Sequence, residues 1–225
     1  MVVGIFPIPL GFDQCYVLKS EGVIAVDAGA PGHGKRFAQG LERVSIHPKD
    51  VQLVVITHGH WDHIGSAKEI KNLTGAKLAM HHREAHWLEQ SLKPLPPGVT
   101  PWGKTFIGIQ KLFMPLITIS PVQVDVLLED EGLSLADFGI PGKVLHTPGH
   151  TQGSVSVLLD TGEAFVGDLA MNRFPLRFSP GLPIFADDLD AVSASWQLLL
   201  AHGARTVYPA HGKPFPAKVI QRALS

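Results

Sequence analysis

Short apolar runs rich in Val, Ile and Leu recur along the chain and are separated by turns that contain Gly, Pro or charged residues. Runs of this length and composition predict buried β-strands. The predicted strands are 2–6, 15–19, 23–26, 51–56, 77–80, 143–146, 154–159, 164–166 and 205–208. Apolar residues at helical spacing predict helices at 33–45, 66–73, 82–89 and 188–202, with a short helix near the end of the chain. The chain therefore combines both kinds of element throughout its length.

Two further apolar runs, 126–128 and 133–135, flank the sequence Glu129-Asp130-Glu131-Gly132. Two short strands joined by a polar turn that contains Gly predict a β-hairpin. We therefore expect these two runs to pair with each other.

The stretch at about 91–125 interrupts this rhythm because it contains six prolines, which predict irregular chain at both of its ends. Between the prolines, Phe106, Ile109 and Phe113 fall on one helical face. Long insertions in compact domains are often lids or binding loops. One hypothesis is a mobile apolar lid that forms a wall of the substrate pocket, with Phe113 in contact with the substrate. A helix packed on the core or on a second subunit, and attachment to a membrane surface, are the alternatives.

Composition narrows the class of protein. The chain has 225 residues, of which 45% are hydrophobic and 17% are charged, below the usual ~25% charged. We interpret residues 1–225 as a single domain that contains the insertion. The net charge of −1 offers no electrostatic footprint for nucleic acid. No apolar run reaches the ~18 residues that span a bilayer, so no transmembrane segment is expected.

Compartment is suggested by two features of the sequence. Cys15 is the single cysteine, which suits a reducing cytoplasm and makes a disulfide within the chain impossible. The first ten residues lack the basic start and the cleavage site of a signal peptide. We therefore expect a cytoplasmic protein.

The strand predicted at 51–56 is followed at once by four side chains that can bind metal, His58, His60, Asp62 and His63. A chain that leaves a strand and turns points successive side chains in different directions, so one short loop can serve two ions. Imidazole and carboxylate are ligands that zinc accepts, and manganese and iron also take this mixture. Three histidines and an aspartate within six positions predict a metal site.

Other histidines give weaker signals. His82 and His86 are four residues apart and share a helix face, with His81 beside them, but no carboxylate completes a familiar motif. We favour an exposed helix end near the mouth of the site over a second metal site. We interpret His146, which opens the sequence His146-Thr147-Pro148-Gly149-His150, as a packed residue at a strand end.

The pattern His58-x-His60-x-Asp62-His63 resembles the signature of the metallo-β-lactamase fold superfamily of metal-dependent hydrolases. Matching motifs occur in family order, and five motifs cover almost the whole chain. They are Val26-Asp27-Ala28-Gly29, the histidine signature, Gly149-His150-Thr151, Gly167-Asp168 and Ala210-His211-Gly212. The resemblance implies a four-layer αββα sandwich with the metals at one edge, between the two sheets.

The resemblance also implies a ligand set for two divalent ions, with zinc as the first expectation and manganese or iron as alternatives. His58, His60 and His150 would hold one ion, Asp62, His63 and His211 would hold the other, and Asp168 would bridge them. Asp27 would accept a hydrogen bond from a ligand histidine or its loop and so orient it. Two ions ~3.5–4 Å apart share a water whose pKa falls towards ~7, so a bridging hydroxide is available at neutral pH. Asp62 or Asp168 would help to move the proton.

Branches of the family can be weighed on single residues. Asp168 argues against true β-lactamases, and His60 argues against flavodiiron oxidases, which carry Glu there. The stretch after His211 is shorter than the glutathione-binding extension of glyoxalase II, and no tyrosine follows Asp168 where acyl-homoserine lactonases carry one. Phosphodiesterases and nucleases of this fold share the ligands, but the charge balance argues against nucleic acid.

The segment after Asp168 contains Arg173 and Arg177 among apolar residues, and either guanidinium could bind a carboxylate or phosphate of the substrate. Two solvated loop arginines are an equal alternative.

Together these patterns favour a dinuclear hydrolase of a small ester, lactone or thioester with an apolar part. The alternatives are a persulfide dioxygenase with one iron, a phosphodiesterase, and a metal-binding protein without catalysis. The expected partner is a small-molecule substrate, and a homodimer is a further hypothesis.

Overall fold

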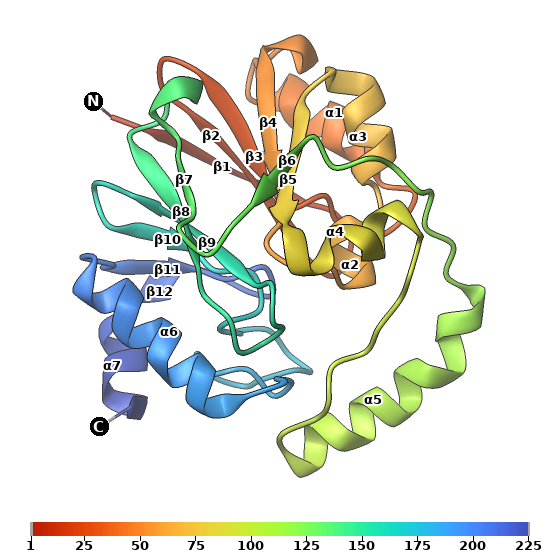
Figure 1. The fold of residues 1–225 in the computed structure, drawn as a ribbon, viewed down its shortest axis with the longest axis vertical. Helices are drawn as coiled ribbons and strands as arrows, with labels where there is room; N and C mark the ends of the chain where they lie inside the picture. The colour runs from red at the N-terminus through yellow and green to blue at the C-terminus, as the bar shows by residue number, and fades with distance from the viewer. Residues whose placement is uncertain (1, 225) are drawn as a thin grey trace.

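Two six-stranded β-sheets lie face to face at the centre of the molecule, and helices cover their outer faces (Figure 1). The computed structural model describes residues 2–224. The first sheet, in spatial order, contains β1 (Gly4–Pro9), β2 (Gln14–Lys19), β3 (Val23–Val26), β4 (Val51–Val55), β5 (Lys77–His81) and β6 (Val126–Leu128). The second contains β12 (Phe215–Pro216), β11 (Thr206–Tyr208), β10 (Glu163–Phe165), β9 (Val155–Leu159), β8 (Gly142–His146) and β7 (Leu133–Ser134).

The helices connect and cover these strands. They are α1 (Gly34–Arg43), α2 (Trp61–Ile64), α3 (Ala67–Thr74), α4 (His82–Glu89), α5 (Pro101–Phe113), α6 (Leu189–Ala201) and α7 (Lys218–Leu224). Three short 3₁₀ turns complete the described elements, η1 (Pro48–Asp50), η2 (Met114–Leu116) and η3 (Ala136–Phe138). Within the described residues, no helix is long and apolar enough to cross a membrane. The predicted αββα sandwich is confirmed.

The apolar runs of the inner strands are explained by burial on both faces. Successive residues of a strand point to opposite sides of the sheet. In β2, Cys15 and Val17 pack with α1 and α3 on the outer side, whereas Tyr16 and Leu18 pack between the two sheets. A third apolar cluster lies between the second sheet and α6 and α7, around the fully buried Trp196. Hence an inner strand of this sandwich is covered on both faces and is mostly apolar in sequence.

The hairpin predicted at 126–135 is wrong. β6 pairs in parallel with β5 in the first sheet, while β7 pairs antiparallel with β8 in the second. The polar turn at 129–132 therefore carries the chain from one sheet to the other. A short apolar run followed by a turn looks the same in both arrangements, because the pattern does not encode the pairing partner.

The insertion folds as one helix held by a neighbouring loop. α5 begins at Pro101, five residues before Phe106, because the Thr100 side chain accepts a hydrogen bond from the Gly103 amide and caps the helix. Its buried Ile107 packs in an apolar cluster with residues of the loop that follows Asp168. In Figure 1, α5 lies at the rim of the molecule, away from both sheets. We use the name "cap" for residues 94–119 together with residues 169–186.

Candidate metal centre

The side chains that can bind metal come from the ends of strands that meet at one edge of the sandwich. The loop that carries His58 and His60 follows β4, and α2 begins directly after His60 with Asp62 and His63 in its single turn. His150 lies four residues past the end of β8. Asp168 and His211 each lie three residues past the end of a strand, β10 and β11 respectively. Because β10 and β11 are parallel neighbours, Asp168 and His211 reach the same edge.

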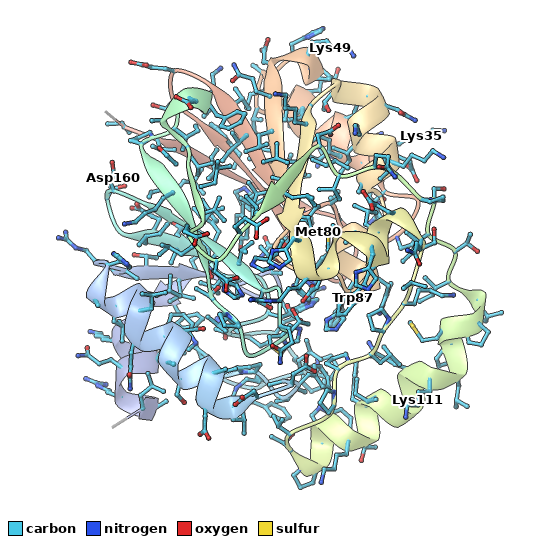
Figure 2. All side chains as sticks on the ribbon, in the orientation of Figure 1. Lys35, Lys49, Met80, Trp87, Lys111 and Asp160 are labelled. Carbon is cyan, nitrogen blue, oxygen red and sulfur yellow. The ribbon has the colours of Figure 1, made fainter. Side chains whose placement is uncertain are left out.

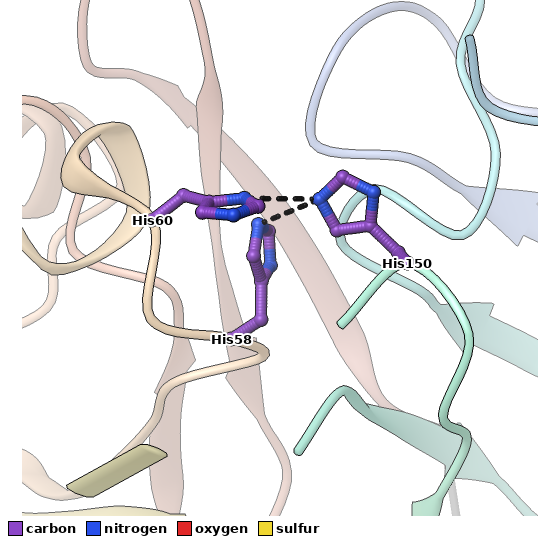
Figure 3. Close-up of side chains that lie close together, drawn as sticks. All are labelled: His58, His60 and His150. Carbon is purple, nitrogen blue, oxygen red and sulfur yellow. Dashed lines mark hydrogen bonds between the residues drawn. The ribbon is translucent and has the colours of Figure 1, made fainter. Parts of the chain in front are cut away.

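Three imidazoles converge on one point (Figure 3). His150 Nε2 lies 3.2 Å from His58 Nε2 and 3.0 Å from His60 Nδ1. All three residues are buried. His150 donates its Nδ1 hydrogen to the Phe185 carbonyl at 2.9 Å, so in the neutral ring Nε2 presents a lone pair to the other two nitrogens. Three nitrogens in this arrangement match a tetrahedral zinc site with one position left open.

A second group of ligand atoms lies beside the first. His211 Nε2 is 3.4 Å from Asp62 Oδ2 and 3.3 Å from Asp168 Oδ1. His63 Nε2 is 3.5 Å from the same Asp168 oxygen. The other Asp168 oxygen, Oδ2, lies 3.7 Å from His150 Nε2. Asp168 therefore faces both groups, as a bridging carboxylate must.

Two buried atoms in the middle of this arrangement lack a hydrogen-bond partner among the described residues, His63 Nε2 and Asp168 Oδ1. An orphaned buried nitrogen and oxygen cost about 1–3 kcal/mol each unless something occupies the space between them. The opposite nitrogens of His63 and His211 are engaged by Asp27 Oδ2 at 3.0 Å and by the Phe12 carbonyl at 3.2 Å. These bonds aim Nε2 of both rings inward, as expected for metal ligands. The residues present thus fit two divalent cations.

Burial and mutual proximity keep the first group ready to bind a cation. Burial is the main cause that lowers the pKa of His60 to about 3, assisted by the neighbouring His150 ring. Burial likewise lowers the pKa of His58 and of His150 below the ordinary histidine value. Neutral imidazole is the form that coordinates metal, so this group needs no proton removed at neutral pH.

In the second group, the pKa of each histidine is raised instead of lowered. Burial alone would lower the pKa of His211, but Asp168 and Asp62 outweigh it and raise the pKa to about 10. Asp27 and Asp168 likewise overcome burial and raise the pKa of His63 well above its usual range. In the metal-free protein these rings therefore carry protons, and a cation that binds here must displace them.

Hydrogen bonds between Asp27 and Thr57 link the chain after β3 to the chain after β4. Asp27 accepts hydrogen bonds from the Thr57 amide and hydroxyl, both at 2.8 Å, and from His63 Nδ1. Because the Thr57 hydroxyl donates to Asp27, its oxygen can accept the Nδ1 hydrogen of His58 at 3.1 Å. One carboxylate therefore orients a histidine of each group. The close approach of Thr57 to the backbone requires Gly167, whose added Cβ would lie 2.4 Å from the Thr57 hydroxyl.

Glu84 joins the two loops that carry the first group. Its carboxylate projects from α4, is almost fully buried, and accepts hydrogen bonds from the Gly59 amide at 2.7 Å and the Gly153 amide at 2.6 Å. Gly59 stands between His58 and His60, and Gly153 follows His150 by three residues. A Cβ on Gly153 would meet the Glu84 carboxyl carbon at 2.9 Å, so the contact requires glycine. Glu84 thus sets the separation of the two loops.

A cavity of about 250 Å³ leads to the ligand atoms. His60, Asp62, His150, Asp168 and His211 form its floor. The walls are mainly apolar and consist of Phe12, Trp61, Leu95, Pro96, Phe106, Gln110, Pro175, Leu176 and Phe185. Most of these wall residues belong to the cap. The cavity accommodates a small molecule whose reactive group points at the ligand cluster and whose remainder is apolar.

The structure places the three predicted substrate contacts outside this cavity. Phe113 is 56% exposed and lies two helical turns beyond Phe106, which does line the wall. Arg173 donates to the Phe12 carbonyl and stacks on the Phe12 ring with 4.5 Å to its centroid. Arg177 donates to the carbonyls of Ser179 and Leu182. Neither guanidinium is among the cavity walls, because both hold loop backbone in place.

Several residues of the site carried no recognisable signal in the sequence. Glu84 is one charged residue on an amphipathic helix, and nothing nearby in the sequence marks it as buried. Asp13 is fully buried, and both of its carboxylate oxygens lack partners among the described residues. Burial, followed by the nearby Asp62 carboxylate, raises the pKa of Asp13 to about 7. Only its position in the folded chain distinguishes it from an ordinary turn aspartate.

The weaker histidine cluster forms a separate polar network. His81 Nε2 and His146 Nδ1 lie 3.1 and 3.4 Å from the same oxygen of Asp130, and the two rings stack 4.2 Å apart. Arg83 also pairs with Asp130 at 2.8 Å, so the carboxylate already has a cation. The Arg83 amide donates to His81 Nδ1, which leaves the hydrogen of neutral His81 on the nitrogen that faces Asp130. His82 and His86 are exposed on α4, as predicted for a helix end, whereas His81 is fully buried and departs from that prediction.

Comparison with known proteins gives the family. The family model described as metallo-beta-lactamase superfamily matches residues 8–211. An uncharacterized protein of Mycobacterium tuberculosis, Rv2581c, is 29% identical over 94% of this chain and 91% of its own length. Hydroxyacylglutathione hydrolase GloC of Haemophilus influenzae is 26% identical over 75% of this chain and 72% of its own.

The solved structures agree on the fold. The structure of BLEG-1, a B3 metallo-beta-lactamase, superposes with a TM-score of 0.70 at 23% identity and covers 96% of this chain and 95% of that protein. At this identity the likeness shows the fold alone. The family match spans most of the sequence, and residues 8–211 include all seven side chains of the two groups described above. The chain therefore belongs to the metallo-beta-lactamase superfamily and is a metal-dependent hydrolase.

Proposed function

We propose that this chain is a dinuclear hydrolase of a small ester, lactone or thioester that carries an apolar group. The observation that supports it best is a cluster of seven side chains able to bind metal, five of which form the floor of a largely apolar cavity. His58, His60 and His150 form one ligand group and Asp62, His63 and His211 the other, with Asp168 between them. When bound, two divalent ions, with zinc first in expectation, would activate water and polarise the scissile carbonyl.

The residues of the chain have distinct roles in this proposal. Phe106, Leu176 and Phe185 hold the apolar part of the substrate, and they exclude water around the reacting carbonyl. The orientation of the histidines is kept by Asp27, Thr57 and carbonyls that accept their Nδ1 hydrogens. Asp62 and Asp168 are the carboxylates closest to the reacting position, and either can take up and release the proton of the attacking water.

A single-metal alternative is less well supported. An iron site of two histidines and one aspartate, as in a persulfide dioxygenase, would leave His63 and His211 without a role. Both rings are buried and both are oriented by a partner at Nδ1. A hydrogen bond at Nδ1 that fixes the ring is typical of a histidine that binds metal through Nε2. These two contacts therefore favour two ions over one.

One of the comparisons bears on thioesters, which the proposed substrate class includes. The similarity to GloC covers 72% of that protein, and its name describes removal of an acyl group from glutathione. Acyl thioesters therefore belong in the first substrate screen beside lactones and simple esters.

The test combines metal analysis with a substrate screen. Protein purified without added metal is analysed for ions per chain, and it is assayed with p-nitrophenyl esters of increasing acyl length, lactones, acyl thioesters and phosphodiesters. We expect nearly two ions per chain, loss of turnover on chelation, and a preference for apolar acyl groups over phosphodiesters. One iron per chain with oxygen consumption on persulfide would refute the proposal, as would turnover of phosphodiesters alone.

A further inference from the structure

The cap concentrates the exposed apolar side chains of the molecule. Twelve large hydrophobic side chains are exposed among the described residues, and seven of them belong to the cap. These seven are Trp102, Ile109, Leu112, Phe113, Leu116, Phe174 and Phe178. The most exposed are Leu112 at 74%, Leu116 at 79% and Phe178 at 92%. Exposed apolar surface concentrated in this way marks an interaction site.

α5 has an inner face that contacts the rest of the molecule and an outer face that is exposed. Phe106 and Gln110 line the cavity and Ile107 is buried, so this side of the helix faces the molecule. At 100° per residue, Leu112 projects from the opposite side, with Ile109 next to it. The outer face is therefore not needed for the fold of α5, nor does it form part of the cavity.

The charges of the cap all have one sign. Residues 94–119 contain two lysines, residues 169–186 contain two arginines, and neither segment contains an Asp or Glu. All 20 acidic residues of the chain lie elsewhere. Lys104 and Lys111 are exposed on α5 itself, and Figure 2 shows Lys111 on this helix at the rim of the molecule. The cap is thus apolar and cationic in a chain whose net charge is −1.

The two cap segments form one unit. The Trp102 indole donates to the Pro175 carbonyl at 2.8 Å, and the Val99 amide donates to the Ile184 carbonyl at 3.0 Å. The rings of Phe106 and Phe185 lie 5.7 Å apart. The exposed side chains of α5 and of the loop 169–186 consequently form one continuous surface beside the cavity.

We propose that the outer face of the cap docks on an anionic lipid surface. A helix with Trp, Phe and Leu beside lysines, and without acidic residues, is typical of segments that lie in the interfacial plane of a membrane. Each lysine gains from the negative surface potential, and the leucines and phenylalanines gain from insertion among acyl chains. This inference concerns binding alone and does not depend on which bond the site hydrolyses.

A second copy of this chain is a poorer occupant of the same face. A two-fold interface would place this surface against itself, and Lys104 and Lys111 of one copy would face the same lysines of the other. No carboxylate in either cap segment is available to pair with them. An anionic surface supplies the missing charge, whereas a copy of the cap adds to the repulsion.

The test is flotation of the full-length protein with vesicles of phosphatidylcholine alone, or of equal parts phosphatidylcholine and phosphatidylglycerol. We expect binding to the anionic vesicles, weak binding to the neutral ones, and release at high salt. The double variant Lys104→Gln/Lys111→Gln should weaken binding about five-fold for each lysine. Leu112→Ser/Leu116→Ser should weaken it by at least about ten-fold.

Matched control variants lie on other helices. Leu189→Ser/Leu198→Ser removes two exposed leucines of α6, and Lys35→Gln/Lys68→Gln removes exposed lysines of α1 and α3. These should bind anionic vesicles as the wild type does, and thermal unfolding checks that every variant is folded. Equal binding to both kinds of vesicle, or binding that the cap variants leave unchanged, would overturn the proposal. So would a dimer in light scattering that dissociates in the Leu112→Ser/Leu116→Ser variant.

Discussion

Replacement of Glu84 by Gln should weaken metal binding although no atom of Glu84 reaches the metal positions. The carboxylate holds two amides, one beside His58 and His60 and one near His150, at 2.7 and 2.6 Å. Gln has the same shape but offers one acceptor, so its amide group must point a hydrogen at one of the two N–H donors. That loop is then released from its position, and the three imidazoles no longer converge as they do in Figure 3.

The magnitude follows from these two bonds. Each hydrogen bond to a charged, buried carboxylate contributes about 1.5–3 kcal/mol, so the Glu84→Gln variant should lose roughly that much stability and Glu84→Ala about twice as much. Removal of a partner that orients a ligand typically lowers metal affinity about 10- to 100-fold. We expect the Gln variant to fall in this range, with a larger loss of stability in the metal-loaded protein than in the metal-free one.

The assay is competition for zinc against a chromophoric chelator, together with urea unfolding with and without metal. The matched control is Glu69→Gln on α3, because Glu69 also accepts two backbone hydrogen bonds, from the amides of Gly32 and Gly34 at 3.2 and 3.0 Å. It holds the loop before α1 and no ligand loop, so zinc affinity should stay at the wild-type level. The reasoning is refuted if Glu84→Gln binds zinc as tightly as the wild type and loses equal stability in both forms.

Three further predictions address the cavity, the bridging carboxylate and pH. Phe106→Ala should raise KM for p-nitrophenyl esters of long acyl chains about ten-fold or more, since about 1.5–3 kcal/mol of apolar contact is removed, whereas Phe113→Ala, which lies outside the cavity, should leave KM unchanged. Asp168→Asn should lower the number of bound ions measured by elemental analysis to about one per chain and reduce kcat more than about 100-fold; two ions per chain with full turnover would contradict the bridging role. The pKa of His211 is raised from 6.5 to about 10 in the metal-free fold, so its contribution to stability is complete below pH 6.5 and is lost as the pH rises towards 10. Urea unfolding of metal-free protein should show this decline, His211→Asn should remove it, and zinc affinity should rise over the same interval because the competing proton leaves.

Local patterns were sufficient for most elements and for the side chains that gather in the candidate metal centre. The run that became β4 is apolar except for Gln52 because both faces of its sheet are covered, and such a run is visible without any tertiary information. The histidines and aspartates that follow the strands stand out for a related reason. Imidazole and carboxylate side chains at the end of a buried strand are costly to bury without a partner. Their residue type and position together therefore already indicate metal chemistry.

The partners of elements were decided by the tertiary structure alone. The runs that became β6 and β7 have the composition of a hairpin, yet they pair in different sheets. Phe106 and Phe113 share one helical face in the sequence, but only Phe106 reaches the cavity, because the helix extends past the cavity before Phe113. Periodicity reports which face of an element is apolar, and it carries no information on what that face meets.

The sequence likewise did not predict which acidic side chains are buried. Glu84 on α4 and Glu69 on α3 are both acidic residues of short amphipathic helices, but Glu84 is buried between two ligand loops whereas Glu69 is exposed at the surface. The difference arises from loops about 25 and 70 residues away in the chain, whose amides satisfy the carboxylate. By itself the sequence determined the sandwich, the strand ends and the set of side chains that can bind metal. The folded chain decided which distant backbone groups hold those ligands in place, because hydrogen-bond partners separated by many residues leave no local pattern.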